Sequence, residues 1–525
     1  MMRRPGWQNI APIVIAITLA GAWITTGLAL CEWCGFLTTE SALISARAVL
    51  AARSDLLTFA SLGVPKPPLA YLAAIPFAGI GLPHPAVWVS ALAGAGLIGW
   101  LAYSFRRVIA SRPALVLLLV AAALLPGVFH SAVTGSATVL GLFAMVVAIQ
   151  LAARFALEEQ NLREARRIGW LSAWIDPERE QAHAIRFLWA AALMLGLASL
   201  ANRGLLLALP IFLLATPLLL PSEDRRNGRK VVTIALLLFL PMATVQALWH
   251  GLSWAFGKEW EGLLLPTSAA VARSSVESFR DGLSWSLRSP VAAAAYLSGG
   301  LLLTGPVLIY VLARLRNAAV ALLCTIPFVI ELVAMLGGRS QLSQAWLSLA
   351  PLLAVMLILL GTQLHRLSSR EVTGLTLATF AAMIFGWQLM ATSPLEEERA
   401  WRRLLAGYDV RTFTAERQLA ELIESTPTAF KVLADDSNAF AVIALLNDAS
   451  RFVLPHEQRF QFTIDNPHVA ASHALLRDPQ LTIRPDLVSR AWSSLGADKT
   501  DRFRTTLQIG GWQLLENETP FTAAR

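Results

Sequence analysis

Long apolar runs recur along the first three quarters of this chain, and they constrain its fold more than any other feature. Eleven of them, mostly of about 17–22 residues, lie between residues 10 and 390. A helix of about 20 apolar residues crosses the ~30 Å hydrocarbon core of a bilayer. Only 15% of the residues are charged, against about 25% in soluble domains. These features exclude a single soluble domain and a disordered chain, and they predict a polytopic α-helical membrane protein.

We expect each run to form one transmembrane helix, about 11 in all. The expected spans cover residues 10–30, 86–104, 113–131, 135–153, 187–202, 204–221, 231–250, 291–313, 318–337, 345–362 and 372–390. The first run could instead be a signal peptide, but it is long for one, and Leu30 before Cys31 is a poor cleavage site. We therefore interpret it as an uncleaved first helix.

Basic residues between the runs indicate how the chain is oriented. With the N-terminus inside, the cytoplasmic connections are 1–9, 105–112, 154–186, 222–230, 314–317 and 363–371. They hold 19 of the 28 Lys and Arg residues of the first 394 positions, in agreement with the positive-inside rule. An odd number of spans then places the C-terminus outside. We predict a multi-pass protein of a bacterial inner membrane with a periplasmic C-terminal domain.

Charge also divides the chain into two predicted domains. Residues 395–525 hold 15 basic and 18 acidic residues, the composition of a soluble domain, whereas residues 1–394 carry a net charge of +11. The excess of Lys and Arg in the membrane part reports orientation rather than nucleic-acid binding. Two long external loops, 31–85 and 251–290, interrupt the membrane domain. The first ends in an apolar, proline-broken segment that we expect to lie along the membrane interface.

The C-terminal domain is expected to be a small α/β domain. Strand-like residues at Phe430 to Ala434 precede a helix-like stretch at Asn438 to Leu446, and Arg451 to Leu454 could form the next strand. Thr506 to Leu515, with two glycines in the middle, is typical of a hairpin. Asp435-Asp436 after the first strand could suggest a metal or nucleotide site, but we favour a helix N-cap.

Polar side chains near the membrane carry the chemical hypotheses, because such residues are costly there. Glu40, Lys66 and Arg203 are all predicted on the external side. Two cations could neutralise a phosphate at the lipid surface while the carboxylate accepts a proton from a hydroxyl. The alternative is structural: Glu40 would cap an interfacial helix, and the cations would bind headgroups.

Other features favour different functions or none. Glu331, inside an apolar run, could belong to the path of a transporter or could pair with Arg339. Cys31 and Cys34 form a C-x-x-C that we interpret as structural or incidental, and three cysteines in all imply no disulfide framework. Walker A, dinucleotide-binding and H-E-x-x-H motifs are missing from the sequence, so nucleotide-driven pumping and zinc proteolysis lack support.

Several short stretches resemble a known family. Thr39-Glu40-Ser41 opens the first external amphipathic segment, and GVPKPPLAY, from Gly63 to Tyr71, follows it. GLASLANRG spans Gly196 to Gly204, and Arg339 precedes a helix that contains Pro351. In these motifs the chain resembles the integral-membrane GT-C glycosyltransferases, above all the lipid A aminoarabinose and galacturonic acid transferases and the protein O-mannosyltransferases.

The resemblance implies a sugar donor on a polyprenyl phosphate and an acceptor, lipid or glycan, in the cell envelope, with membrane lipids as surroundings and no nucleic acid. By the resemblance Lys66 and Arg203, with Tyr71 and Arg339, would hold the donor phosphate. Glu40 would be the catalytic base, and Asp55 is the second candidate. Whether a divalent cation takes part is open.

At two positions where the family has an Asp, this sequence has a different residue. The first is Thr39, and the second is either Gly135 or Ser136. Two other functions therefore stay in view: a lipid or ion transporter, and a non-catalytic subunit for envelope assembly.

Overall fold

A computed structural model of the protein describes fifteen stretches of the chain. These are residues 7–53, 68–106, 108–167, 177–201, 208–220, 226–257, 322, 367–391, 396–426, 431–446, 449–455, 457–466, 471–478, 486–493 and 503–518. The spans expected at 291–313, 318–337 and 345–362, apart from Leu322, lie outside these residues, and so does most of the loop 251–290.

The chain divides into two compact units, each described below by itself. The first comprises Met1–Gly27, Ser90–Gly251 and Gly262–Asp409. The second comprises Leu28–Val89, Leu252–Glu261 and Val410–Arg525, so the first external loop belongs with the C-terminal residues. These units group residues that pack together. The predicted boundary between residues 394 and 395 separates membrane-embedded residues from soluble ones, and it stays a prediction.

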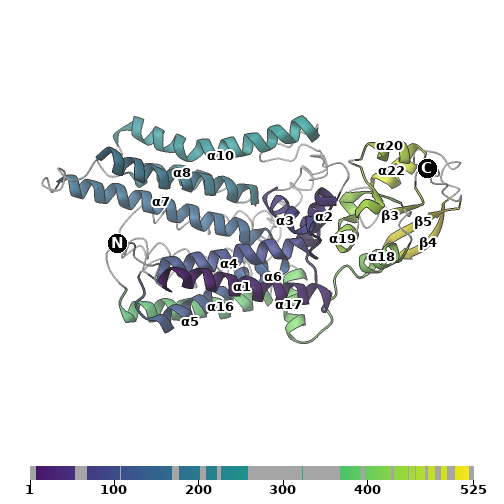
Figure 1. The fold of residues 1–525 in the computed structure, drawn as a ribbon, viewed down its shortest axis with the longest axis horizontal. Helices are drawn as coiled ribbons and strands as arrows, with labels where there is room; N and C mark the ends of the chain where they lie inside the picture. Colours follow the sequence, from purple (N-terminus) through teal and green to yellow (C-terminus); the bar gives the residue numbers. More distant parts are fainter. Residues whose placement is uncertain are drawn as a thin grey trace, which may run out of the picture. The chain divides into compact units, whose positions relative to one another are not determined.

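Helices make up most of the first unit, and the ends of three of them extend into the second (Figure 1). The helices include α1 (Trp7–Glu32), α4 (Pro85–Phe105), α7 (Thr138–Arg167), α8 (Pro177–Ala201), α9 (Ala208–Leu219), α10 (Gly228–Gly257) and α16 (Ser369–Ala391), with the short α17 (Glu396–Leu405) after them. All of these except α17 lie over expected spans, one helix to a span. Among the described residues, α1, α4, α7 and α10 are long and apolar enough to cross a membrane. The chain is thus a multi-pass membrane protein.

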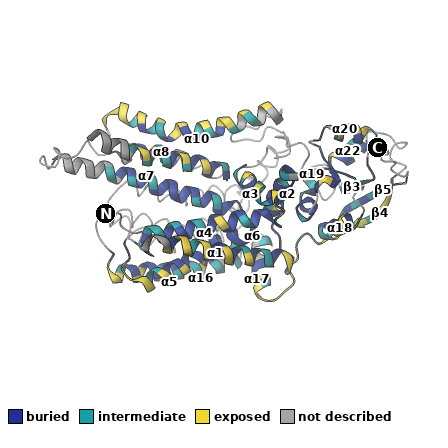
Figure 2. Ribbon diagram, viewed as in Figure 1, coloured by how far each residue is buried: buried dark blue, intermediate teal, exposed yellow. Residues whose placement is uncertain are grey.

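Burial separates inner helices from peripheral ones. In the membrane-length stretches of α4 and α7 most residues are buried, whereas in those of α1 and α10 only about a quarter are, and the rest are intermediate or exposed (Figure 2). The exposed residues of α10 include Val232, Leu236, Leu240 and Leu248. Apolar side chains on the outside of a helix are stable in lipid and costly in water. The periphery of this unit is therefore suited to contact with acyl chains.

One expected span, 113–131, is wrong as a single straight helix. The structure has α5 (Arg112–Ala123) and α6 (Pro126–Thr134), bent by 61° at the break between them. Pro126 has no amide hydrogen to donate and drives Leu125 out of helical geometry, to φ −55° and ψ 127°. The pair counts as one broken span or as a re-entrant segment, which brings the candidate spans among the described residues to at most five.

A mixed sheet lies at the centre of the C-terminal part of the second unit (Figure 1). Its strands are β1 (Val432–Ala434), β2 (Phe452–Val453), β3 (His473–Arg477), β4 (Phe503–Ile509) and β5 (Trp512–Asn517). The order is β2-β1-β3-β5-β4, with β1 parallel to both neighbours and the β4–β5 hairpin antiparallel to β3. The expected strands after residues 430, 451 and 506 lie where the sequence indicated, whereas β3 was not predicted.

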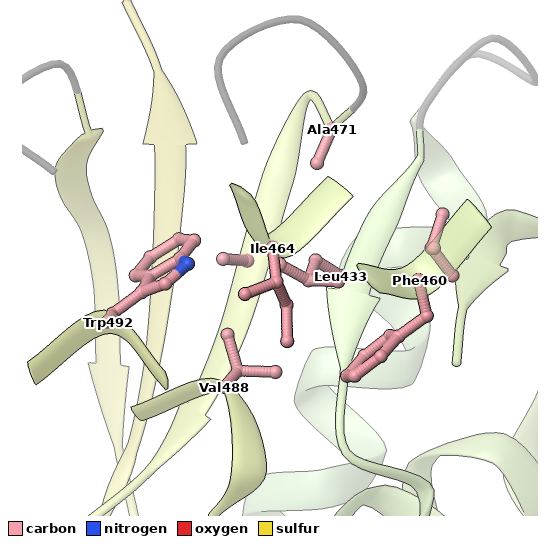
Figure 3. Close-up of a cluster of buried hydrophobic side chains, with 8 residues drawn as sticks. Leu433, Phe460, Ile464, Ala471, Val488 and Trp492 are labelled. Atoms are coloured by element: carbon pink, nitrogen blue, oxygen red, sulfur yellow. The ribbon is translucent and has the colours of Figure 1, made fainter. Parts of the chain in front are cut away.

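Helices cover both faces of this sheet. They are α18 (Thr414–Ser425), α19 (Asp436–Leu445), α20 (Gln458–Asp465) and α22 (Leu487–Ser493). Leu433 of β1 faces a buried cluster with Phe460, Ile464, Val488 and Trp492, drawn in Figure 3. Because side chains alternate along a strand, the neighbours of Leu433 in β1 face the opposite side, and they are buried as well.

Candidate functional site

Glu40 lies in the first turn of α2 (Thr39–Arg53), where the sequence predicted a helix to open. The Thr38 hydroxyl accepts a hydrogen bond from the Ser41 amide at 3.2 Å, and the Thr38 carbonyl accepts one from Ala42. A carboxylate in the first helical turn is favoured by the helix dipole. Glu40 is half-buried, so it stays accessible while the helix orients it.

Tyr71 lies in the first turn of α3 (Leu69–Gly79), and it is buried. Helices α2 and α3 pack against each other. The segment that joins them, residues 54–67, contains Asp55 and Lys66, which lie outside the described residues. Of the six candidate residues from the sequence, Glu40 and Tyr71 are therefore placed, on two helices in contact.

The GLASLANRG stretch begins in the last two turns of α8, and its Arg203 lies outside the described residues, as does Arg339. The structure shows what holds the start of this stretch. The Gln246 side chain of α10 donates a hydrogen bond to the buried Ser199 hydroxyl at 2.6 Å, and Ser199 donates to the Gly196 carbonyl. Buried polar bonds between apolar helices fix their register. The helix that leads to Arg203 is thereby anchored.

Gly135 and Ser136, the second place where the sequence departs from the family pattern that it resembles, have a local structural role. Gly135 ends α6 in the left-handed region, at φ 81°, where glycine is the least strained residue. The Ser136 hydroxyl then accepts a hydrogen bond from the Thr138 amide, at the start of α7. This turn joins two helices and supplies no carboxylate.

A carboxylate–imidazole pair, which sequence reasoning missed, lies close to α2 in the chain. His84 Nε2 is 3.1 Å from Glu32 Oε1, joining the end of α1 to the start of α4. His84 is buried, has a backbone φ of 47°, and its Nδ1 lacks a hydrogen-bond partner among the described residues. Non-glycine residues with positive φ are uncommon and often mark functional sites. Fifty-two residues separate the two side chains in sequence, so spacing gave no signal.

The C-terminal residues contact the same helix α2. Arg47 of α2 forms an ion pair with Asp436, and the two side chains are only 11% and 12% exposed. Asp435, next to it, is the N-cap of α19: its carboxylate accepts a hydrogen bond from the Ser437 amide at 2.9 Å. The N-cap interpretation of Asp435 is confirmed.

A second buried carboxylate lies near Asp435. Asp486 precedes α22, accepts a hydrogen bond from the Ser489 amide, and is 1% exposed. The Leu487 amide donates to Asp435, which brings the two carboxylates close together. Burial, reinforced by the negative charge of Asp435, raises the pKa of Asp486 to about 6.

The part of the chain that the structure describes contains no cluster of side chains that could bind a metal ion. No group of three or more His, Cys, Asp or Glu side chains lies together there. Cys31 and Cys34 are both free thiols. Glu331, the candidate for a transport path, lies outside the described residues.

Comparison with solved structures reveals a likeness over almost the whole chain. The crystal structure of ArnT from Cupriavidus metallidurans bound to undecaprenyl phosphate matches with a TM-score of 0.52 at 13% identity, over 96% of this chain and 98% of that one. The apo oligosaccharyltransferase of Archaeoglobus fulgidus matches with a TM-score of 0.40 at 11% identity, over 93% of this chain and 72% of that one.

No protein-family model matches the sequence, and no curated protein matches it either. At 13% identity the first likeness concerns the fold, and the fold extends over both the helical part and the C-terminal part of the chain.

Proposed function

We propose that this chain, which has the fold of the GT-C glycosyltransferases, transfers a sugar from a polyprenyl phosphate to a cell-envelope acceptor. The observation that carries the proposal is the match of almost the entire chain to a protein crystallised with undecaprenyl phosphate. The GVPKPPLAY stretch, whose last residues open α3 beside α2, supports it independently. A fold alone does not define a reaction, so the residues must supply the chemistry.

The proposed site lies at the periplasmic surface of the inner membrane, and residues 395–525 form a domain on the same, periplasmic side. Lys66 and Arg203 neutralise the donor phosphate, with Tyr71 and Arg339 as further contacts. Opposite charges at short range bind a phosphate, and they stabilise it further as it leaves. The same cations therefore act in binding and in the transition state.

The reaction is a displacement at the anomeric carbon of the sugar. An acceptor hydroxyl oxygen forms the new bond to this carbon, the bond from carbon to phosphate oxygen breaks, and polyprenyl phosphate departs. The proton of the hydroxyl passes to Glu40, whose half-buried place in the first turn of α2 keeps it accessible. Asp55 is the second candidate base. One displacement inverts the anomeric configuration.

The test uses purified protein in liposomes with a panel of polyprenyl-phosphate-linked sugars: a hexose, a hexuronic acid and an aminopentose. Envelope extract supplies acceptors, and mass spectrometry measures the free polyprenyl phosphate that is released. Wild type should release it from at least one donor, and Lys66→Ala should lose at least 100-fold in rate, as expected for a cation at a leaving group. Glu331→Gln is the matched control, because it removes the carboxylate that the competing hypothesis assigns to transport, and it should leave release unchanged. Loss of function in Glu331→Gln with full function in Lys66→Ala would refute the proposal.

A further inference from the structure

Residues 410–413, at the start of the C-terminal part, bind the loop that leads into α2. The Thr412 hydroxyl donates a hydrogen bond to the Leu37 carbonyl at 2.7 Å and accepts one from the Leu37 amide at 2.7 Å. The Thr412 amide donates to the Gly35 carbonyl at 3.0 Å. One threonine thus satisfies three backbone groups of the loop, and a side chain without the hydroxyl would leave two of them without this partner.

The middle of α2 is held by a second contact from the same part of the chain. Asp436 lies in the first turn of α19, where a carboxylate is favoured, and pairs with Arg47. Helices α2 and α19 pack together along this contact. Because both side chains are almost fully buried, the loss of one partner leaves a charge in a poorly solvated place.

A third contact reaches the end of α1. Arg417 of α18 donates a hydrogen bond to the Cys31 carbonyl at 3.3 Å. Gly35, with φ at 63°, lies so close to Arg411 that an added Cβ would be 2.8 Å from its Cγ. The segment that leads into α2, from Cys31 to Leu37, is therefore contacted along its length by residues of the C-terminal part.

Glu40 lies between these contacts, three residues after Leu37 and seven before Arg47. A helix of 15 residues is marginal by itself, so its position depends on what packs against it. A catalytic group displaced by about 1 Å can lose about 100-fold in rate. The placement of Glu40 thus depends on residues that lie more than 370 positions away in the sequence.

We infer that Thr412 and the Arg47–Asp436 ion pair are positioning residues that hold α2 so that Glu40 faces the acceptor hydroxyl. This inference rests on the proposed function. It makes the C-terminal part a component of the catalytic site, in addition to any role in binding the acceptor. Removal of either contact should lower the turnover rate and leave donor binding, which the proposal assigns to other residues, unchanged.

The experiment compares Thr412→Val, Thr412→Ser and Asp436→Asn in the full-length protein. The matched control is Thr506→Val, which removes a similar hydroxyl-to-carbonyl bond, to Leu514, within the β4–β5 hairpin. Hydrogen exchange measures the opening of α2, and the release assay measures kcat and the KM for the donor that wild type uses.

Thr412→Val and Asp436→Asn should each accelerate amide exchange in α2 by about tenfold, equivalent to a loss of about 1.4 kcal/mol. They should also lower kcat by at least tenfold at unchanged KM. Thr412→Ser keeps the hydroxyl, so both values should stay at the wild-type level. Thr506→Val should also leave both at the wild-type level.

Unchanged exchange in α2, or faster exchange with unchanged kcat, would overturn the positioning role. A wild-type protein that releases no polyprenyl phosphate from any donor would instead refute the proposed function. The exchange data identify which of the two has failed, because they do not depend on turnover.

Discussion

Replacing Asp486 by Asn should stabilise the C-terminal sheet at neutral pH and have little effect in acid. Asp486 is 1% exposed, and one of its carboxylate oxygens lacks a hydrogen-bond partner among the described residues. Burial raises its pKa from 3.8 to about 6, and the charge of Asp435 adds to this shift. Asn keeps an oxygen for the Ser489 amide and is as good an N-cap as Asp.

The sign and size follow from the two pKa values. A group whose folded-state pKa lies above its unfolded value stabilises the fold below the unfolded pKa, and this contribution is lost as the pH rises through the folded pKa. Between 3.8 and about 6 the change amounts to about 3 kcal/mol, at about 1.4 kcal/mol for each pH unit. Wild type therefore bears a penalty of about 3 kcal/mol near neutral pH, which the neutral Asn avoids.

Hydrogen exchange in the full-length protein measures this difference locally, in peptides from β3 and α22. Near pH 7.5 the variant should be protected about 100-fold more than wild type, and near pH 4 the difference should fall to a few-fold. Burial also lowers the pKa of His473 to about 4, an effect that favours the fold at higher pH. Because His473 is present in both proteins, its contribution cancels in the comparison. Equal protection near pH 7.5, or a difference that does not change with pH, would refute this reasoning.

Three further changes test other parts of the account. Gly35→Ala should destabilise the approach to α2 by about 1–2 kcal/mol, because it combines a positive φ with a clash against Arg411; wild-type thermal stability would contradict this. Gln246→Leu should cost about 0.6–1.7 kcal/mol through the lost bond to Ser199, measured by unfolding in detergent, and an unchanged midpoint would exclude that bond as an anchor. Glu40→Gln should lower kcat by at least 100-fold while the donor still binds, and full transfer activity would remove Glu40 from the mechanism.

Patterns of local sequence predicted much of the secondary structure. Runs of apolar residues located α1 and α4. The residues of a membrane helix are consecutive in sequence, so one apolar run shows both where the helix lies and how long it is. The hairpin of β4 and β5 was predicted from its two glycines, which adopt φ of 54° and 77° in the turn. The N-cap at Asp435 was predicted because capping depends on neighbouring residues alone.

Some local features, and contacts between distant residues, could not be predicted in the same way. The bend at Pro126 lay within an apolar run whose hydropathy gave no sign of it. Strand β3 has the short apolar core Ala474 to Leu476, which periodicity alone does not distinguish from a turn of helix. The pairs Glu32–His84 and Arg47–Asp436 join residues that only the fold brings together. Glu40 was placed on its helix by the sequence, and the structure added the contacts that hold this helix.

Retention of a polyprenyl phosphate by the gently purified protein tests the central claim most directly. Native mass spectrometry would compare wild type with the Lys66→Ala, Arg203→Ala double variant, each supplied with added polyprenyl phosphate. Wild type should carry one bound polyprenyl phosphate and the double variant should lose it, because two cations hold the phosphate. A wild-type protein that retains only bulk phospholipid would contradict the account and favour transport instead.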